Sequence, residues 1–235
     1  MRIGSILLLD NQRCVQSYHW SKFRPLGSLQ LAMDSLEEFE CDEVAIIRPV
    51  RDKDSLDLFA KDLDVIRALN TMTPISFGGG IRTLQHLELL KDLPIERLML
   101  SSSFIAQDES LIEKACSLFG HQAVQCVLPV KLIGEIVCVY DCKLAKFCPL
   151  DAIDLVFVDQ FANEIVIYDV DNDGAVNSFD ESFLDGHPFQ RKKIVVTGGI
   201  GKSTIDWARR HGLASVLIDN KVLHQECSIK SYKHV

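Results

Sequence analysis

The chain has 235 residues, of which 47% are hydrophobic, and its formal net charge at pH 7 is −8. This length suits a single domain over residues 1–235, because α/β barrels commonly reach this size as one unit. The acidic balance, with no basic stripe, argues against a nucleic-acid partner. No apolar run is long enough to span a membrane, so we expect no membrane partner.

The N-terminus favours a cytoplasmic protein, and this location sets what is expected of the cysteines. The apolar run Ile6–Leu9 is too short for a signal peptide, and it ends at Asp10 without a small-residue cleavage site. The eight cysteines are then expected to be free thiols. Even the closest group, Cys138, Cys142 and Cys148, lacks the spacing of a zinc site. We therefore expect no metal and no cofactor.

Short apolar runs alternate with amphipathic stretches along the whole chain. The expected strands are Ile3–Leu9, Glu43–Ile47, Pro74–Phe77, Arg97–Leu100, Gln122–Val127, Glu164–Tyr168, Lys193–Thr197 and Ser215–Ile218. The clearest expected helices are Ser28–Phe39, Leu56–Leu69, Thr83–Lys91, Ser110–Phe119, Ala152–Gln160 and Lys202–His211. Eight buried strands with helical crossovers predict an α/β fold closed into a (βα)8 TIM barrel. An open doubly wound sheet is the alternative, although it normally has fewer units. Residues 11–27 are expected to form a long first loop.

Similar segments recur about half a chain apart. The pairs are Pro74–Ile81 with Lys193–Ile200, Glu43–Ile47 with Glu164–Tyr168, and Arg97–Ser101 with Ser215–Asp219. Within the first pair, Gly80 and Gly199 are 119 residues apart. Three matches in near register predict that the barrel consists of two related half-barrels.

Two glycine clusters, Gly78–Gly80 and Gly198–Gly199, follow the third and seventh expected strands. Glycine lets the backbone approach an anion closely, so that amide groups point at phosphate oxygens. Barrels also commonly bind phosphate after the seventh and eighth strands. The clusters thus suit a substrate with a phosphate at each end, whereas the alternative is that they only permit tight turns.

The segment Asp169–Gly174 resembles part of a calcium-binding loop, with Asp180 in the place of the last ligand. A strand rather than a helix is expected before it, which argues against calcium. We interpret the segment as a strand-end loop that carries Asp171 and Asp173 at the mouth of the barrel.

Four segments together resemble the cyclase subunit of imidazole glycerol phosphate synthase, an enzyme of histidine biosynthesis: Gly78–Ile81, Ser117–Val124, Asp171–Gly174 and Val196–Gly201. The resemblance covers almost the whole chain and weakens around residues 131–150. Members of that family take ammonia from a glutaminase partner through the barrel to a doubly phosphorylated ribonucleotide. The resemblance implies phosphate ligands at Gly80, Ser101, Ser102, Asp173, Gly174, Gly199, Asn220 and Lys221.

The chain departs from the family where the family performs acid–base chemistry. The family's two catalytic aspartates align with Leu8 and Pro129, and neither side chain can move a proton. Asp10, two residues beyond Leu8 on the same strand face, is a candidate substitute. Asp171 is the second candidate catalytic residue.

Four charged residues stand at the starts of strands: Arg2, Glu43, Arg97 and Glu164. In the family, the matching positions form a ring that gates the entry of ammonia. Charges that face a barrel axis need partners, and two of each sign neutralise one another. The alternative is that the four side chains only cap the bottom of the barrel for stability.

Three functions remain open on the sequence. The chain resembles divergent cyclase-like subunits that receive ammonia from a glutaminase-like partner and serve amide or amidine formation on bacterial surface sugars. It is alternatively a working histidine-pathway cyclase with displaced acid–base groups. A third reading is a non-catalytic barrel that binds a phosphate ester.

Overall fold

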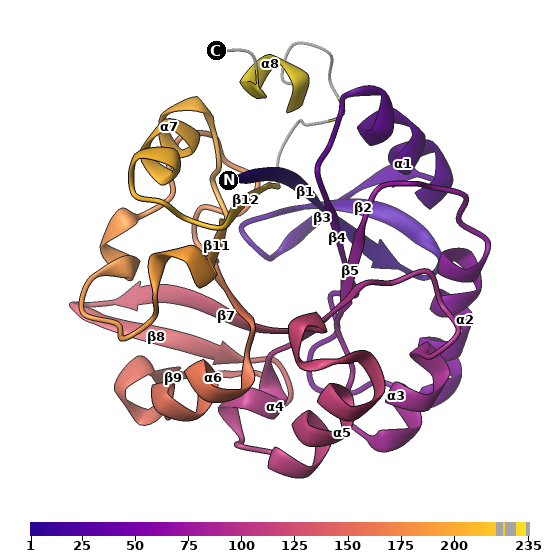
Figure 1. Ribbon diagram of the computed structural model, residues 1–235, viewed down its shortest axis with the longest axis horizontal. Helices are drawn as coiled ribbons and strands as arrows, with labels where there is room; N and C mark the ends of the chain where they lie inside the picture. The colour runs from indigo at the N-terminus through magenta and orange to yellow at the C-terminus, as the bar shows by residue number, and fades with distance from the viewer. Residues whose placement is uncertain (220–222, 224–228, 234–235) are drawn as a thin grey trace.

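The computed structural model describes residues 1–219, 223 and 229–233. Its centre is a closed barrel of parallel strands (Figure 1). The barrel strands are β1 (Arg2–Asp10), β4 (Val44–Ile47), β5 (Ile75–Gly78), β6 (Arg97–Leu100), β7 (Val124–Ile133), β10 (Glu164–Asp169), β11 (Ile194–Thr197) and β12 (Ser215–Ile218). Pairing of β10 with β7 and of β12 with β1 closes the ring. The predicted (βα)8 barrel is confirmed.

Helices surround the barrel (Figure 1), and their buried apolar side chains form one hydrophobic cluster with side chains of the strands. They are α1 (Leu29–Glu38), α2 (Leu56–Arg67), α3 (Leu84–Leu90), α4 (Ser102–Ile105), α5 (Glu109–Phe119), α6 (Leu155–Phe161), α7 (Lys202–Arg210) and α8 (Ile229–Lys233). The side chains of Ser28, Ser55, Asp108 and Asp154 accept backbone hydrogen bonds at the starts of α1, α2, α5 and α6, which fixes where each helix begins. Within the described residues, no helix has the length and apolar character needed to cross a membrane.

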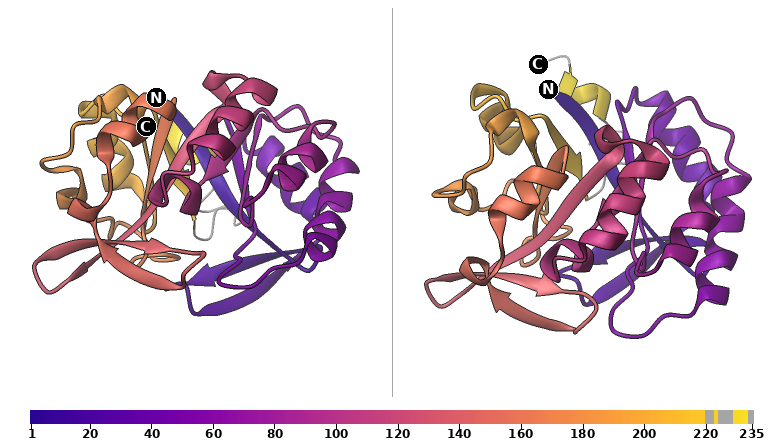
Figure 2. Two further views of the ribbon diagram at one scale, coloured as in Figure 1. Left: turned by 90° about the horizontal axis from the view of Figure 1, so that it is seen from below. Right: turned by 60° about the horizontal axis from the view of Figure 1, so that its bottom comes forward.

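Two β-hairpins project from the end of the barrel where the strands finish, opposite the N-terminus (Figure 2). The first is β2 (Arg13–Tyr18) with β3 (Lys22–Gly27), and the second is β8 (Ile136–Asp141) with β9 (Lys146–Pro149). The expectation of a loop over residues 11–27 is therefore wrong. Asn11 and Gln12, which join β1 to β2, both have positive φ, as a two-residue hairpin turn requires. Pro25 is tolerated because β3 lies at the edge of the sheet.

Side chains that point into the barrel form three layers, because neighbouring strand residues alternate between its two faces. The layer at the strand starts holds Arg2, Glu43, Arg97, Gln125 and Glu164. The middle layer is an apolar cluster of Ile6, Ala45, Met99, Val127, Val166, Val195 and Leu217. The layer at the strand ends holds Leu8, Ile47, Ser101, Pro129 and Tyr168, all of which line a pocket.

The two halves of the barrel repeat one another, as the sequence predicts. In each half a long strand, β1 or β7, runs into an antiparallel hairpin. Gly79 and Gly198 occupy equivalent positions in the two halves and have similar backbone conformations, with φ of 95° and 92°. A Cβ would lie 2.0 Å from the Arg48 carbonyl oxygen at Gly79 and 2.2 Å from that of Asp169 at Gly198. Both glycines are therefore required by close contact between neighbouring strand ends.

Candidate functional site

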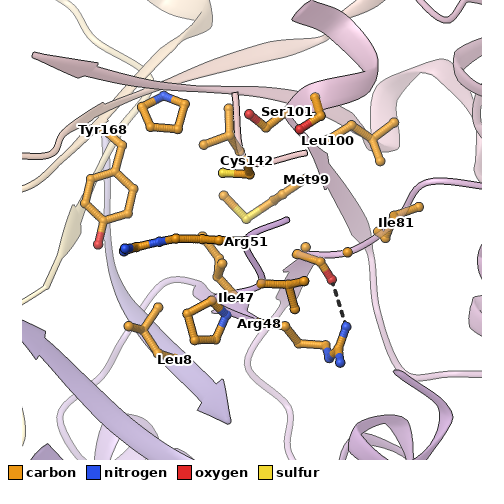
Figure 3. Close-up of a pocket in the computed structure, with 18 of the residues that line it drawn as sticks. Leu8, Ile47, Arg48, Arg51, Ile81, Met99, Leu100, Ser101, Cys142 and Tyr168 are labelled. Carbon is orange, nitrogen blue, oxygen red and sulfur yellow. Dashed lines mark hydrogen bonds between the residues drawn. The ribbon is translucent and has the colours of Figure 1, made fainter. Parts of the chain in front are cut away.

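The described residues enclose a pocket at the carboxyl ends of the strands. It contains about 830 Å³ of space, a volume that includes the solvent at its open mouth. Leu8, Ile47, Met99 and Pro129 line its apolar part (Figure 3). The remaining walls come from the glycine loop after β5, the ends of β6 and β10, and the two hairpins.

The first half of the barrel supplies the polar wall of this pocket. Ser101 and Ser102, directly after β6, line it together with Gly80. The Ser101 hydroxyl is buried and has no hydrogen-bond partner among the described residues. Because buried hydroxyls are normally satisfied, an unpaired hydroxyl in a pocket indicates a place for a ligand atom. The structure thus brings together the three residues predicted to bind phosphate in this half.

Two arginines of the pocket have no carboxylate within ion-pair distance in the described part of the chain. The Arg51 guanidinium donates to the carbonyl oxygen of Trp20 at 2.5 Å and lies 4.9 Å from its ring centroid. Arg82 donates to the carbonyl oxygen of Asp52 at 2.5 Å. Figure 3 shows Arg51 reaching across the pocket. Their unneutralised charges favour an anionic ligand.

A third arginine, Arg48, also lines the pocket, but its charge is already paired. Its guanidinium contacts Asp54 at 2.7 Å and Asp62 at 2.8 Å, and it lies 4.9 Å from the centroid of Phe59. Its side chain is 3% exposed. Arg48 also donates to the carbonyl oxygen of Gly79 at 3.4 Å (Figure 3). It therefore stabilises the glycine loop more than it attracts a ligand.

The equivalent loops of the second half are arranged around a carboxylate. Asp219 accepts hydrogen bonds from the backbone amides of Gly174 at 2.7 Å, Gly199 at 3.1 Å and Ile200 at 3.3 Å. Burial raises the pKa of Asp219 to about 7, and the nearby Asp173 carboxylate adds to the increase. Asp219 was not among the predicted site residues.

Asp173 is buried as well and holds the side chain of Tyr168. The Tyr168 hydroxyl donates to Asp173 Oδ1 at 2.6 Å, and the backbone amide of Trp20 donates to Oδ2 at 3.0 Å. Burial, followed by the Asp173 charge, raises the pKa of Tyr168 well above its ordinary value. Tyr168 therefore remains a protonated donor in the pocket wall at neutral pH.

The candidate acid–base residues do not line the pocket, whereas Leu8 and Pro129 do. Asp10 is exposed at the turn into the first hairpin and accepts a hydrogen bond from Asn11 at 3.1 Å. Asp171 is exposed and pairs with Lys131 at 3.1 Å. Their catalytic roles stay predictions, and the geometry leaves both away from the enclosed space.

At the opposite end of the barrel, the four predicted ring residues meet. Arg2 pairs with Glu43 at 3.0 Å and with Glu164 at 2.6 Å, and Arg97 pairs with Glu43 at 3.3 Å. Gln125 donates to Glu164 at 2.8 Å, and the Ser215 hydroxyl donates to Glu43. The geometry suits a gate as well as a cap, so the role of the ring stays a prediction.

Several pocket residues escaped the sequence interpretation, namely Trp20, Arg51, Arg82 and Tyr168. The signal available was their position, since Arg51 and Arg82 follow strands or glycine loops at the expected mouth of the barrel. The predicted ligands Asn220 and Lys221 lie outside the described residues. Among those described, no group of three or more His, Cys, Asp or Glu side chains is placed to hold a metal ion.

Comparison with known proteins gives consistent matches. A family model described as histidine biosynthesis protein matches residues 2–228. A Campylobacter jejuni protein provisionally named imidazole glycerol phosphate synthase subunit hisF2 is 30% identical over 207 residues, covering 86% of this chain and 80% of that protein. A Vibrio vulnificus protein of the same provisional name is 26% identical over 208 residues, or 86% of this chain and 75% of the relative. The imidazole glycerol phosphate synthase subunit HisF of Endomicrobium trichonymphae is 27% identical over 183 residues, or 73% and 68%.

Proposed function

The chain belongs to the histidine biosynthesis protein family, as a divergent member of its imidazole glycerol phosphate synthase cyclase group, and from this premise we propose that it is an ammonia-accepting synthase subunit. It receives ammonia from a glutaminase-like partner at the charged ring and uses it on a phosphorylated substrate in the pocket. The observation that carries this proposal is the placement of these two features at opposite ends of one barrel.

The anion site is formed by the first half of the barrel. Arg51 and Arg82 supply positive charge, Ser101 supplies an unpartnered hydroxyl, and the loop at Gly80 lets a ligand approach the backbone. Hydrogen bonds from charged donors are worth about 1.5–3 kcal/mol each, so two such donors would contribute about 3–6 kcal/mol to the binding of a phosphate group.

The middle layer of the barrel lies between the ring and the pocket. Its side chains are apolar and at most 7% exposed. Ammonia is neutral and small, whereas ammonium carries a charge that an apolar layer excludes. A ring of paired charges that rearranges when a partner binds would admit ammonia and keep out water and ions.

The proposal also specifies the class of molecule that accepts the ammonia. The walls of the pocket suit a phosphorylated or nucleotide-linked sugar, because Trp20 and Tyr168 offer aromatic surface beside the arginines. Formation of an amide or amidine on a surface sugar is the reaction class we propose. We place it in the cytoplasm, since the seven described cysteines are all free thiols.

A second function, a non-catalytic barrel that binds a phosphate ester, is favoured by one observation. Leu8 and Pro129 occupy the floor of the pocket, where neither can transfer a proton. A histidine-pathway cyclase has less support, because Asp10 and Asp171 are exposed and outside the pocket lining.

The proposed function is tested by purifying the chain from its source cells and assaying glutamate release from glutamine in the purified fraction. We expect glutamine-hydrolysing activity to accompany the wild-type chain and to be lost with Arg97→Glu, which reverses one charge of the ring. Lys146→Glu, on the second hairpin at the other end of the barrel, is the control and should retain the activity.

Assays of the chain in the absence of a glutaminase partner distinguish the remaining functions. Turnover of the family's ribonucleotide with ammonium salt alone would establish a histidine-pathway cyclase. Absence of any associated glutaminase, together with phosphate binding and no turnover, would establish the non-catalytic barrel and refute the proposed function.

A further inference from the structure

The two halves of the barrel differ at one pair of equivalent positions. Ser101 directly follows β6 and Asp219 directly follows β12, while Gly80 and Gly199 stand two residues beyond β5 and β11. These four residues are therefore related by the internal repeat. In the first half the strand end carries a neutral hydroxyl that has no hydrogen-bond partner within the described part of the chain. In the second half it carries a carboxylate with three backbone amide donors.

A buried carboxylate held by backbone amides makes the same contacts that a bound phosphate oxygen would make. The amides of Gly174 and Gly199 point at Asp219 Oδ2, at 2.7 and 3.1 Å, and both residues were predicted to bind phosphate. The Asp219 side chain thus takes the place of an external anion at these donors.

The surroundings of Asp219 also disfavour an incoming anion. Asp173, which is 1% exposed, adds a second carboxylate, and its charge contributes to the raised pKa of Asp219. Among the described residues, the nearest ionisable groups that a phosphate dianion would meet here are two carboxyl groups, whereas in the first half it would meet Arg51 and Arg82, which have no carboxylate within ion-pair distance there.

The first hairpin covers the same loop from outside. The backbone amide of His19 donates to the Asp173 carbonyl oxygen at 3.0 Å, and that of Trp20 donates to Asp173 Oδ2 at 3.0 Å. A Cβ on Gly174 would lie 2.6 Å from the Ser17 carbonyl oxygen. In accord with this packing, none of the residues 171–174 or 198–201 lines the described pocket, whose polar wall lies in the first half (Figure 3).

We propose that the Asp219 carboxyl group, by occupying these backbone amide donors, closes the second phosphate site, so that this protein takes a substrate with one phosphate group, bound in the first half. The substrate class is a sugar monophosphate or a comparable ligand whose other end is neutral and packs against Trp20 and Tyr168. This inference deepens the proposed function and rests on it only for the presence of a phosphorylated substrate.

Counting phosphate sites tests the inference, with inorganic phosphate as the probe. We expect isothermal titration of the wild-type chain to give one phosphate per chain. In ¹H–¹⁵N spectra, phosphate should shift the amide signals around Gly80, Ser101 and Ser102 and leave those of Gly174 and Gly199 in place. Because the spectra use only the unaltered chain, this result does not depend on a variant that folds.

Reciprocal substitutions at the equivalent positions give the matched variants. Asp219→Ser should open the second site and raise the stoichiometry from one phosphate to two. Ser101→Asp should place a carboxylate in the first site and abolish the response around Gly80. The double variant should bind one phosphate, now with shifts at Gly174 and Gly199.

Two phosphates on the wild-type chain, or shifts at Gly174 and Gly199 before any substitution, would overturn the inference. No response from the wild-type chain, with one site gained on Asp219→Ser, would refute the first-half site of the proposed function and still support closure by Asp219. The association of a glutaminase is measured separately, so the two proposals fail in distinguishable ways.

Discussion

The ion pair between Arg2 and Glu164 should couple two strands that are distant in the sequence. Their side chains are 2.6 Å apart, with Glu164 9% exposed and Arg2 32% exposed. Exposed pairs contribute about 0.2–1 kcal/mol, and loss of one partner from a buried pair costs about 3–5 kcal/mol. Partial exposure of Arg2 places this pair between these limits, at about 2 kcal/mol. For a chain of this size, that corresponds to a decrease in Tm of about 4–8 °C.

A double-mutant cycle with Arg2→Met and Glu164→Gln measures this coupling. Urea unfolding, followed by the fluorescence of Trp20 and Trp207, gives the free energy of unfolding for each variant. The control cycle uses the exposed pair Asp64 and Arg67, which should couple by less than about 0.5 kcal/mol. An Arg2–Glu164 coupling no larger than that of the control would refute the reasoning that the ring stabilises the barrel.

Three further predictions follow from burial, backbone geometry and ionisation. Asp62→Ala removes one of two carboxylates from a buried guanidinium that keeps Asp54 as a partner, and it should cost about 1.5–3 kcal/mol in urea unfolding for the lost charged hydrogen bond, whereas Asp64→Ala, at an exposed site, should change stability by less than about 0.5 kcal/mol. Gly79→Ala places a Cβ 2.0 Å from a backbone carbonyl oxygen and should lower the yield of folded protein, while Gly134→Ala, with no atom within 4 Å, should cost only about 1 kcal/mol for its positive φ. The pKa of Asp219, raised from 3.8 to about 7, means that the unfolded chain loses this proton at a lower pH than the folded chain. Its stabilising contribution is therefore fully present below about pH 4 and is lost by about pH 7, a change on the order of 4 kcal/mol. Comparison with Asp219→Asn across this range isolates the effect, and parallel pH profiles for the two proteins would contradict it.

The barrel was predictable from the sequence because its signals are local. Each strand is a short apolar run bounded by polar residues, and eight such runs with helical crossovers leave few arrangements. The same signals, short apolar runs and helical crossovers, did not predict the hairpins. The chain turns from β1 into β2 at Asn11 and Gln12 and from β2 into β3 at His19 and Trp20, all with positive φ and without a glycine. The outer strand of the first hairpin, β3, also contains Pro25. Edge position and turn geometry decide such segments, and neither is evident from hydrophobic periodicity.

The grouping of the ring residues was predictable for a related reason. Residues at equivalent ends of parallel strands must meet, so Arg2, Glu43, Arg97 and Glu164 could be grouped before any distance was known. The pocket arginines were harder to identify. Arg48 is neutralised by Asp54 and Asp62, whereas Arg51 and Arg82 are not, and only the fold shows which carboxylates each guanidinium reaches.

Asp219 shows most clearly what a repeat can and cannot predict. The repeat aligns it with Ser101 and thereby places it at a phosphate site, yet an acidic residue there has two opposite interpretations. The carboxylate either prevents the site from binding an anion or takes the place of the bound anion. The direction of the amides of Gly174 and Gly199, which donate to the carboxylate, favours replacement. A half-barrel whose anion donors are occupied by its own side chain leaves the other half to decide which substrate is bound.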